Sequence, residues 1–320
     1  MWRRPFPWLI VGAALAYAFV PYVSDNVQLR ESLLLAAVYI TLASNLNLMI
    51  GYTGYVNFGN IVFFGLGGYI SLYMITAHQW PVVLATLLAG AAVSALALLF
   101  GLGILRLRGA FFALATIGVN QAVAQLVINF EPWGGATGIY LSLDTYESLG
   151  GSMPALWIAY LLIVAVMAAS LLLSYAIRNS KFGIGLLAIS QNEDAASVLG
   201  VPTPLYKALI YSTSAYLPAV AGGLYFFKSG IIEPTSAFSL QTSIEAIVMV
   251  MLGGSGTVIG PALGAFLYEE LRGYLLTAQA FSHFQLVIAG VLLLLIVLFV
   301  PGGFMGWFHQ RIPRLRKILE

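Results

Sequence analysis

The chain has 320 residues, of which 60% are hydrophobic and only 8% are charged. About a quarter of the residues of an ordinary soluble domain are charged. So few charges cannot cover the surface of a water-soluble protein of this size, so we expect a membrane protein whose surface faces mainly lipid. The positive charges lie between apolar runs, which makes them a signal of membrane topology and not of nucleic-acid binding.

Metal and thiol chemistry are excluded by the same composition. The chain contains no cysteine, which rules out disulfides, thiol catalysis and cysteine-based metal sites. Its three histidines, His78, His283 and His309, lie far apart and lack the spacing of metal ligands. We therefore expect no metal site.

The apolar runs predict an all-α, polytopic membrane protein that forms one domain over residues 1–320. About 20 apolar residues cross a bilayer as a helix. In chain order the runs are 8–23, 33–50, 61–77, 82–105, 109–130, 154–177, 208–227, 244–272 and 284–300. Gly253-Gly254-Ser255-Gly256 interrupts the run 244–272, so two shorter passes are expected there and about ten transmembrane or half-spanning helices in all. The first run follows Arg3 and Arg4 and is typical of a signal peptide, but further runs follow at once, so we expect an uncleaved helix.

Basic residues predict the orientation of these helices. If the spans alternate from a cytoplasmic N-terminus, eleven of the fourteen Lys and Arg residues fall inside and three, Arg30, Lys228 and Arg272, fall outside. Cytoplasmic loops carry an excess of Lys and Arg. The sequence therefore predicts that both termini are cytoplasmic.

A glycine-rich stretch follows the second apolar run. Residues 51–60 contain three glycines and two asparagines, which makes a continuous helix unfavourable. Irregular backbone at membrane depth is tolerated where protein or a cavity covers it, and interrupted helices often mark the substrate region of a transporter; residues 253–264 form a second such stretch. We take Asn47, Tyr55 and Asn57 as candidate lining of a transport path. The alternative is that the glycines only allow close helix packing or turns.

Three amides lie on one face of the fifth run. Gln121, Gln125 and Asn129 are spaced at i, i+4 and i+8, so they point the same way from a helix. A polar side chain within a span is costly unless it faces a partner or a water-filled path. The stripe therefore indicates either a lining that exchanges hydrogen bonds with a polar solute or amides that hold helices together.

Two loops and one carboxylate complete the candidate features. An acidic, glycine-rich loop, about 131–153, is expected outside, and the longest cytoplasmic loop is about 178–206. Glu245 lies near the start of a span, where it is either a proton or ion site or a carboxylate placed at a helix N-terminus. No Asp, His or Lys accompanies it within a span, which weakens a proton-coupled mechanism.

Five glycine-containing motifs occur in a fixed order along the chain. They are Leu46-Asn47-Leu48 leading into Gly51-Tyr52-Thr53-Gly54 and Phe63 to Tyr69; Leu107-Arg108-Gly109-Ala110-Phe111-Phe112-Ala113; Gly134-Gly135-Ala136-Thr137-Gly138-Ile139; Ser243 to Thr257 with Gly260-Pro261 and Gly264-Ala265; and Pro301-Gly302-Gly303. Together, over about residues 41–306, they resemble the membrane subunits of branched-chain amino acid ABC importers, and most closely the LivM-type permease.

The long cytoplasmic loop is also similar to that family. Glu193, Asp194, Ala195, Ala196 and Gly200 resemble the coupling segment of ABC permeases, which implies a short helix that docks on an ATPase. Without the other motifs, the same residues would be an ordinary solvated loop helix. Where family members often carry Arg, this chain has Ile184, Leu187 and Ser190, which implies a differently charged docking surface and a dedicated ATPase pair.

The resemblance implies an ABC importer permease fold in the bacterial inner membrane and no covalent chemistry. The implied partners are a second, LivH-like permease, two cytoplasmic ATPases that bind ATP and Mg²⁺, and a periplasmic or lipid-anchored binding protein; this chain would hold no cofactor. The implied cargo is a branched-chain or other amino acid, or a related small amide. Tyr55, Asn57 and Asn60 stand where the family usually has Gln, Ser and His, which leaves the solute open.

The alternative functions are a secondary transporter and a membrane enzyme. Glu245 favours a secondary transporter driven by an ion gradient, whereas the 193–200 segment favours the importer. A membrane enzyme is not supported, because the sequence contains no paired carboxylates, histidine cluster or nucleophile with a base. The segment Gly253 to Thr257 lacks the lysine of a phosphate-binding loop, so we expect no ATP hydrolysis by this chain.

Overall fold

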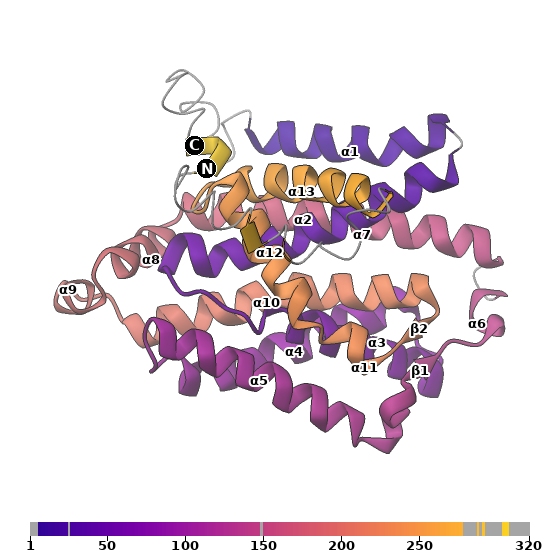
Figure 1. Ribbon diagram of the computed structural model, residues 1–320, viewed down its shortest axis with the longest axis horizontal. Helices are drawn as coiled ribbons and strands as arrows, with labels where there is room; N and C mark the ends of the chain where they lie inside the picture. The colour runs from indigo at the N-terminus through magenta and orange to yellow at the C-terminus, as the bar shows by residue number, and fades with distance from the viewer. Residues whose placement is uncertain are drawn as a thin grey trace.

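The computed structural model describes residues 6–24, 26–147, 150–277, 287, 290–291 and 303–306. Its helices run side by side along the long axis of the molecule (Figure 1). The helices α8 and α9 lie at one end, and the short strands β1 and β2 lie at the opposite end with α6 (Figure 1). We call these the α9 end and the β end.

The described chain is almost entirely helical, as the apolar runs predict. Seven helical stretches are long and apolar enough to cross a membrane: Phe6–Val23, Val27–Thr53, Asn60–His78, Val82–Ile104, Ala110–Ile128, Ser152–Arg178 and Pro234–Gly253. The helices are α1 (Phe6–Ser24), α2 (Val27–Thr53), α3 (Asn60–His78), α4 (Val82–Ile104), α5 (Ala110–Ile128), α6 (Leu143–Glu147), α7 (Ser152–Arg178), α8 (Lys181–Gln191), α9 (Glu193–Val198), α10 (Thr203–Ser229), α11 (Pro234–Ala237), α12 (Leu240–Gly253) and α13 (Gly260–Thr277).

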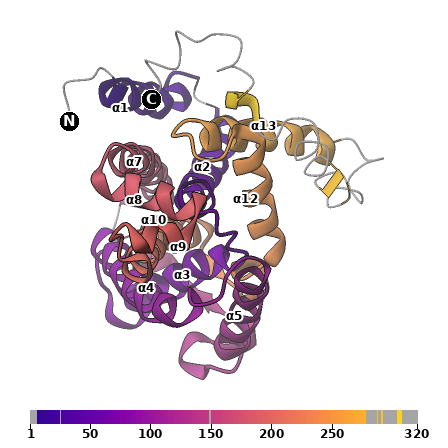
Figure 2. The same ribbon diagram turned by 90° about the vertical axis from the view of Figure 1, so that its left-hand side faces the viewer.

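The helix α10 forms the centre of the bundle. Its 27 residues span about 40 Å at 1.5 Å per residue, and it packs mainly against α3 and α4 and also against α2 and α7 (Figure 2). Small residues make this contact close: a Cβ atom on Gly67 would lie 2.1 Å from the carbonyl oxygen of Ala219. A Cβ on Gly222 would lie 2.0 Å from the carbonyl oxygen of Phe64. Glycine is therefore required where α3 and α10 cross.

Both predicted interruptions are confirmed, and the second packs against the last turn of the helix that precedes the first. The helix α2 ends at Thr53, Gly54 takes a left-handed conformation (φ 76°), and α3 begins only at Asn60. The second break, residues 254–259, separates α12 from α13 and contains Gly256 at φ 76°. A Cβ on Gly51 would lie 2.3 Å from the Gly256 amide nitrogen. The glycines thus allow the non-helical segment 254–259 to lie against the end of α2 inside the bundle.

The β end is closed by a two-stranded antiparallel sheet. In it β1 (Ile139–Tyr140) pairs with β2 (Ile231–Ile232), with Ile139 opposite Ile232. Just before β1, the predicted glycine-rich loop contains two 3₁₀ turns, Glu131–Trp133 and Gly135–Thr137. The pairing joins this loop to the segment that follows α10.

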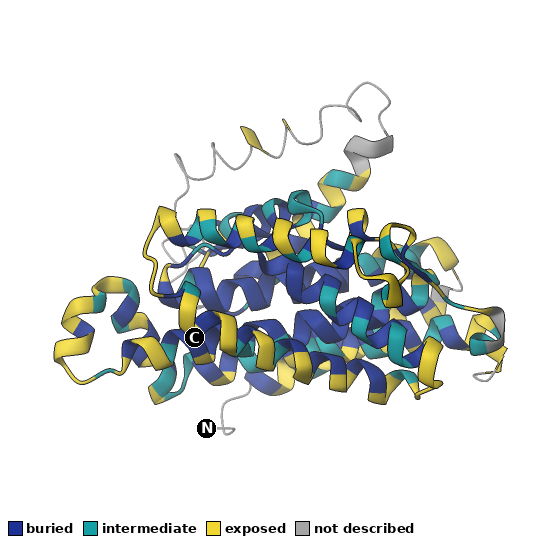
Figure 3. Ribbon diagram, turned by 90° about the horizontal axis from the view of Figure 1, so that it is seen from below, coloured by how far each residue is buried: buried dark blue, intermediate teal, exposed yellow. Residues whose placement is uncertain are grey.

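Burial divides the helices into an inner and an outer set. The inner helices are buried along most of their length, whereas exposed residues gather on the outer helices and around α9 (Figure 3). The helix α2 is 83% buried over its membrane window, and α5 is only 22% buried. The predicted span 284–300 lies outside the described residues except for positions 287 and 290–291.

Candidate functional site

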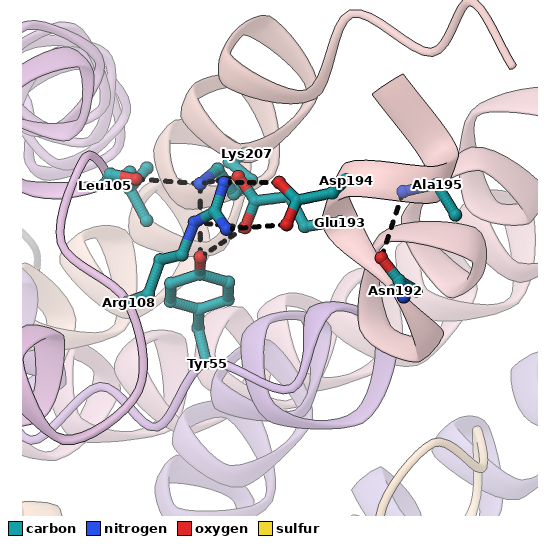
Figure 4. A network of polar contacts seen from close by, with 8 residues as sticks. All are labelled: Tyr55, Leu105, Arg108, Asn192, Glu193, Asp194, Ala195 and Lys207. Atoms are coloured by element: carbon teal, nitrogen blue, oxygen red, sulfur yellow. Dashed lines mark hydrogen bonds and ion pairs between the residues drawn. The ribbon is translucent and has the colours of Figure 1, made fainter. Parts of the chain in front are cut away.

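A buried lysine holds the short helix α9 against the bundle. Lys207, near the start of α10, donates from Nζ to the Glu193 carboxylate at 2.7 Å and to the Leu105 carbonyl at 2.8 Å. Its side chain is only 4% exposed. The Tyr55 hydroxyl donates to the other Glu193 oxygen at 2.7 Å and lies 3.2 Å from Lys207 Nζ. Glu193 therefore joins three segments of the chain at one point (Figure 4).

Arg108 adds a second, more exposed contact to the same helix. Its guanidinium donates two hydrogen bonds to the Asp194 carboxylate, at 2.9 and 3.2 Å, and its Nε lies 3.7 Å from Glu193. Asn192 caps the start of α9, since its side chain accepts from the Ala195 amide at 3.0 Å. The acidic pair therefore faces the α4–α5 turn and α10 of its own chain (Figure 4).

The two carboxylates remain ionised for different reasons. Partial burial alone would raise the pKa of Glu193, but hydrogen bonds from Lys207 and Tyr55 and the nearby positive charges outweigh it, so the pKa is lowered from its usual value. The hydrogen bonds from Arg108, together with its charge, lower the pKa of Asp194. The lowered pKa values keep both carboxylates ionised at neutral pH. We call Tyr55, Arg108, Glu193, Asp194 and Lys207 the α9 latch.

The latch continues into the break before α3. Tyr55 lies in the non-helical segment 54–59, and further along that segment the Phe58 amide donates to the Thr116 hydroxyl of α5 at 3.1 Å. Gly59 lies against the same residue, because a Cβ there would be 2.8 Å from the Thr116 carbonyl oxygen. Residues 55–59 therefore link Glu193 of α9 to Thr116 of α5.

The amide stripe of α5 faces away from its own chain. Gln121, Gln125 and Asn129 are all exposed, whereas Asn120 on the opposite face is buried and donates to the Phe238 carbonyl at 3.0 Å. Apart from the bond from Asn129 Nδ2 to the Gln125 carbonyl at 2.7 Å, the stripe is directed outward. Amides exposed on a membrane-spanning helix need a polar surrounding. That the surrounding is a transport path stays a prediction.

Asn47 does not line a path and is corrected to a structural residue. It is fully buried, its Nδ2 donates to the Thr257 carbonyl at 2.9 Å, and its Oδ1 accepts from the Gly256 amide at 2.8 Å. The side chain thus satisfies the backbone of the second break. Arg178 at the end of α7 also donates to the Gly256 carbonyl, so the break is held from two helices.

Two further assignments to the path change with the structure. Asn57 is fully buried, and its Oδ1 accepts from the Gly59 amide at 2.9 Å, which shapes the segment before α3. Tyr55 belongs to the α9 latch. Sequence spacing suggested a shared lining because both residues lie in one interrupted segment, but the segment turns their side chains to different neighbours.

Glu245 also lies inside the chain and has a companion charge. It is 3% exposed and accepts from Gln241 Nε2 at 2.9 Å and from the Tyr39 hydroxyl at 3.4 Å. Arg272 of α13 donates to the same hydroxyl at 2.7 Å and lies 3.6 Å from Glu269. The expectation named only Asp, His and Lys as companions within a span, and Arg272, which the topology placed outside the spans, reaches Glu245 through Tyr39.

The tip of the loop at the α9 end presents large apolar side chains. Val198 and Leu199 are 87% and 82% exposed, and Ile184 is also exposed. In contrast, Ala196 is 2% exposed and packs inside the chain. Gly200 follows with φ 89°, as expected for a residue that ends a helix. Of the residues that resemble a coupling segment, Ala196 is therefore not available to contact a docked ATPase.

Lys207, Arg108 and Thr116 are the functional candidates that sequence reasoning missed. Lys207 served there only as a topology signal and Arg108 also as part of a family motif. Nothing in their spacing indicates that they meet an acidic pair 14 and 86 positions away. Within the described residues, no three His, Cys, Asp or Glu side chains come together as metal ligands.

Comparison with known proteins places the chain in a family. Over residues 28–297 it matches the family described as branched-chain amino acid transport system, permease component. The match covers well over half of the chain. The chain belongs to this family. It is thus a multi-pass transport permease and not itself an enzyme, and no solved structure matches it.

Individual relatives support the same family. The chain is 26% identical to the high-affinity branched-chain amino acid transport system permease protein LivM of Escherichia coli (strain K12), over 84% of this chain and 68% of the relative. It is also 26% identical to LivH of Salmonella typhimurium, over 87% of this chain and 94% of the relative. The ribose import permease protein RbsC of Bacillus subtilis is 30% identical over 43% of this chain and 46% of its own length.

Proposed function

We propose that this chain is one of two permease subunits of an ATP-driven importer in a bacterial inner membrane, and that its cargo is an amino acid or a related small amide. The observation that carries the proposal is the exposed amide stripe of α5. Three amides that face hydrocarbon would be costly, so they require a covering surface. A second permease subunit with a polar path along the contact supplies both the cover and hydrogen-bond partners.

The α9 end is then the site at which ATP hydrolysis acts. Two ATPase subunits, which would bind ATP and Mg²⁺, dock on the exposed tip of the loop and move α9. The latch passes that movement through segment 54–59 to α5. A periplasmic or lipid-anchored protein would deliver the solute at the β end. The names of the relatives, which include LivM and LivH, support this arrangement.

Uptake by the reconstituted complex tests the proposal. The chain is co-expressed with the permease, ATPases and binding protein encoded beside it, and uptake of radiolabelled L-leucine and other amino acids into proteoliposomes is measured with and without ATP. We expect uptake that requires both ATP and the ATPases. In the same assay Gln125→Leu should lower uptake at least tenfold with unchanged assembly, whereas Leu126→Met, on the neighbouring exposed position of α5, should not.

Two results would count against it. Solute movement by the purified chain alone, driven by an ion gradient, would support a secondary transporter. Full uptake in separate Leu variants of Gln121, Gln125 and Asn129 would show that the stripe only holds helices together.

A further inference from the structure

A cavity of about 330 Å³ lies inside this single chain, in the half that contains the β end. It is bounded by α2, α3, α10 and α12 and by the segment from β2 to α11. This volume is within the range of cavities that hold small organic molecules. The cavity is separate from the exposed stripe of α5, because its lining includes no residue of that helix.

The deep part of the cavity is apolar. Val38, Leu42, Ile61 and Phe64 line it and are buried. Ile61 is the second residue of α3, so the cavity ends where the interrupted helix begins, and the Ile61 amide there donates to the Ser243 hydroxyl at 3.2 Å. An occupant needs an aliphatic or aromatic body to fill this part.

The mouth of the cavity presents hydrogen-bond acceptors. Glu233, Ser229 and Ser236 line it and are exposed. The Ser229 hydroxyl donates to the Tyr225 carbonyl at 3.0 Å, and the Ser236 hydroxyl donates to the Glu233 carbonyl at 3.1 Å. Since a hydroxyl has one proton to give, both oxygens offer only lone pairs to an occupant.

The charge around the mouth favours a cation. Among the described residues, no Lys or Arg forms an ion pair with Glu233. Lys228, five residues before it, is paired with Glu31, and Arg272 behind the cavity wall donates to Tyr39. An ammonium group provides a positive charge and several hydrogen-bond donors. These complement the Glu233 carboxylate and the acceptor lone pairs of the Ser229 and Ser236 hydroxyls.

We propose that this cavity binds a small organic ammonium ion with an aliphatic body, a class that includes the zwitterionic aliphatic amino acids. The ammonium lies at Glu233 and the body fills the space between α2 and α3. That the occupant is the transported solute rests on the proposed function. The proposal adds a binding site within one subunit and a positively charged group on the solute that this site recognises. A lipid acyl chain is the competing occupant, and it would have no use for the acceptor-rich mouth.

Cysteine protection tests the site directly, because the natural chain has no cysteine and therefore no background labelling. Ile231→Cys places a thiol in the lining while leaving every polar group of the mouth intact. Ser142→Cys, exposed at the same end but outside the lining, is the matched control. The purified full chain in lipid nanodiscs is labelled with a maleimide in the presence of 3-methylbutylammonium, L-leucine or 4-methylpentanoate.

We expect the ammonium and L-leucine to slow labelling at position 231 at least fivefold, with no effect of 4-methylpentanoate and no effect at position 142. Adding Glu233→Gln should raise the concentration needed for protection at least tenfold, whereas Glu131→Gln, another exposed carboxylate near β1, should leave it unchanged. Equal protection by 4-methylpentanoate, or protection that survives Glu233→Gln, would identify a purely apolar or lipid pocket. Absence of protection by the ammonium would also overturn the proposal. The measurement uses no ATPase. Protection can therefore be absent while ATP-driven uptake is observed, and it can be present while ATP-driven uptake is absent.

Discussion

At the scale of single residues, the ion pair between Glu193 and Lys207 is the contact on which the α9 end depends. Lys207 is 4% exposed and Glu193 is 15% exposed, so the lysine would be left buried without its carboxylate if Glu193 were neutralised. The folded-state pKa of Glu193 is lowered. Its stabilising contribution is therefore complete above the ordinary Glu pKa of about 4.3 and is lost as the pH falls through the lowered folded value.

Replacing Glu193 by Gln should accordingly destabilise the chain and weaken the coupling between ATP hydrolysis and transport. We expect a loss of roughly 2 kcal/mol in the free energy of unfolding. This is less than for a fully buried pair, because Glu193 is 15% exposed and its second positive neighbour, Arg108, faces solvent. This corresponds to a melting temperature lower by about 4 °C, measured in detergent, together with weaker ATP-driven uptake. Asp194→Asn should have a smaller effect, since Asp194 is 78% exposed and pairs with the exposed Arg108. A Glu193→Gln protein with normal melting and uptake would refute the latch.

At the scale of elements, α9 is a connector with two different faces. At its start, Glu193 and Asp194 contact Lys207 and Arg108 of the same chain. At its end, Val198 and Leu199 are exposed. Exposed apolar residues on a polar loop are typical of a protein interface. The buried Ala196 explains why a bulky residue there would disturb the chain's own packing and would not test docking.

Changing both Val198 and Leu199 to Glu should remove the docking surface. We expect normal membrane levels and melting of the chain, but at least a tenfold loss of ATPase co-purification, because two carboxylates would have to be buried in the contact. Tyr140→Glu, an exposed aromatic position in β1 at the opposite end, should leave co-purification unchanged. Undiminished co-purification of the double variant would place the ATPase contact elsewhere.

At the scale of the whole molecule, the two ends differ in charge. Five described basic residues, Arg106, Arg108, Arg178, Lys181 and Lys207, lie on the segments that end at or lead into the α9 end, and Arg30, Lys228 and Arg272 lie toward the β end. The helices alternate between these ends in the order that the sequence predicts. The positive-inside rule therefore predicts that the α9 end is cytoplasmic.

Labelling with an impermeant thiol reagent tests this orientation. A cysteine at Thr145, in α6, should react from outside intact cells or right-side-out vesicles, and a cysteine at Gln191, the last residue of α8, should react only after permeabilisation. The absence of natural cysteines keeps the background low. The opposite pattern would reverse the orientation and with it the assignment of the α9 end to the ATPases.

The amino-acid sequence by itself determined the class of protein, the helices, the two interruptions and the polar stripe of α5. These depend on local properties, namely hydropathy over about 20 residues, the backbone freedom of glycine and the helical period, so they can be read from neighbouring positions. The α9 latch, the role of Asn47, the partner of Glu245 and the cavity depend on residues up to 233 positions apart. Only the packing of α10 against α3 and of the second glycine break against the end of α2 brings those residues together. No local pattern encodes which distant side chains become neighbours.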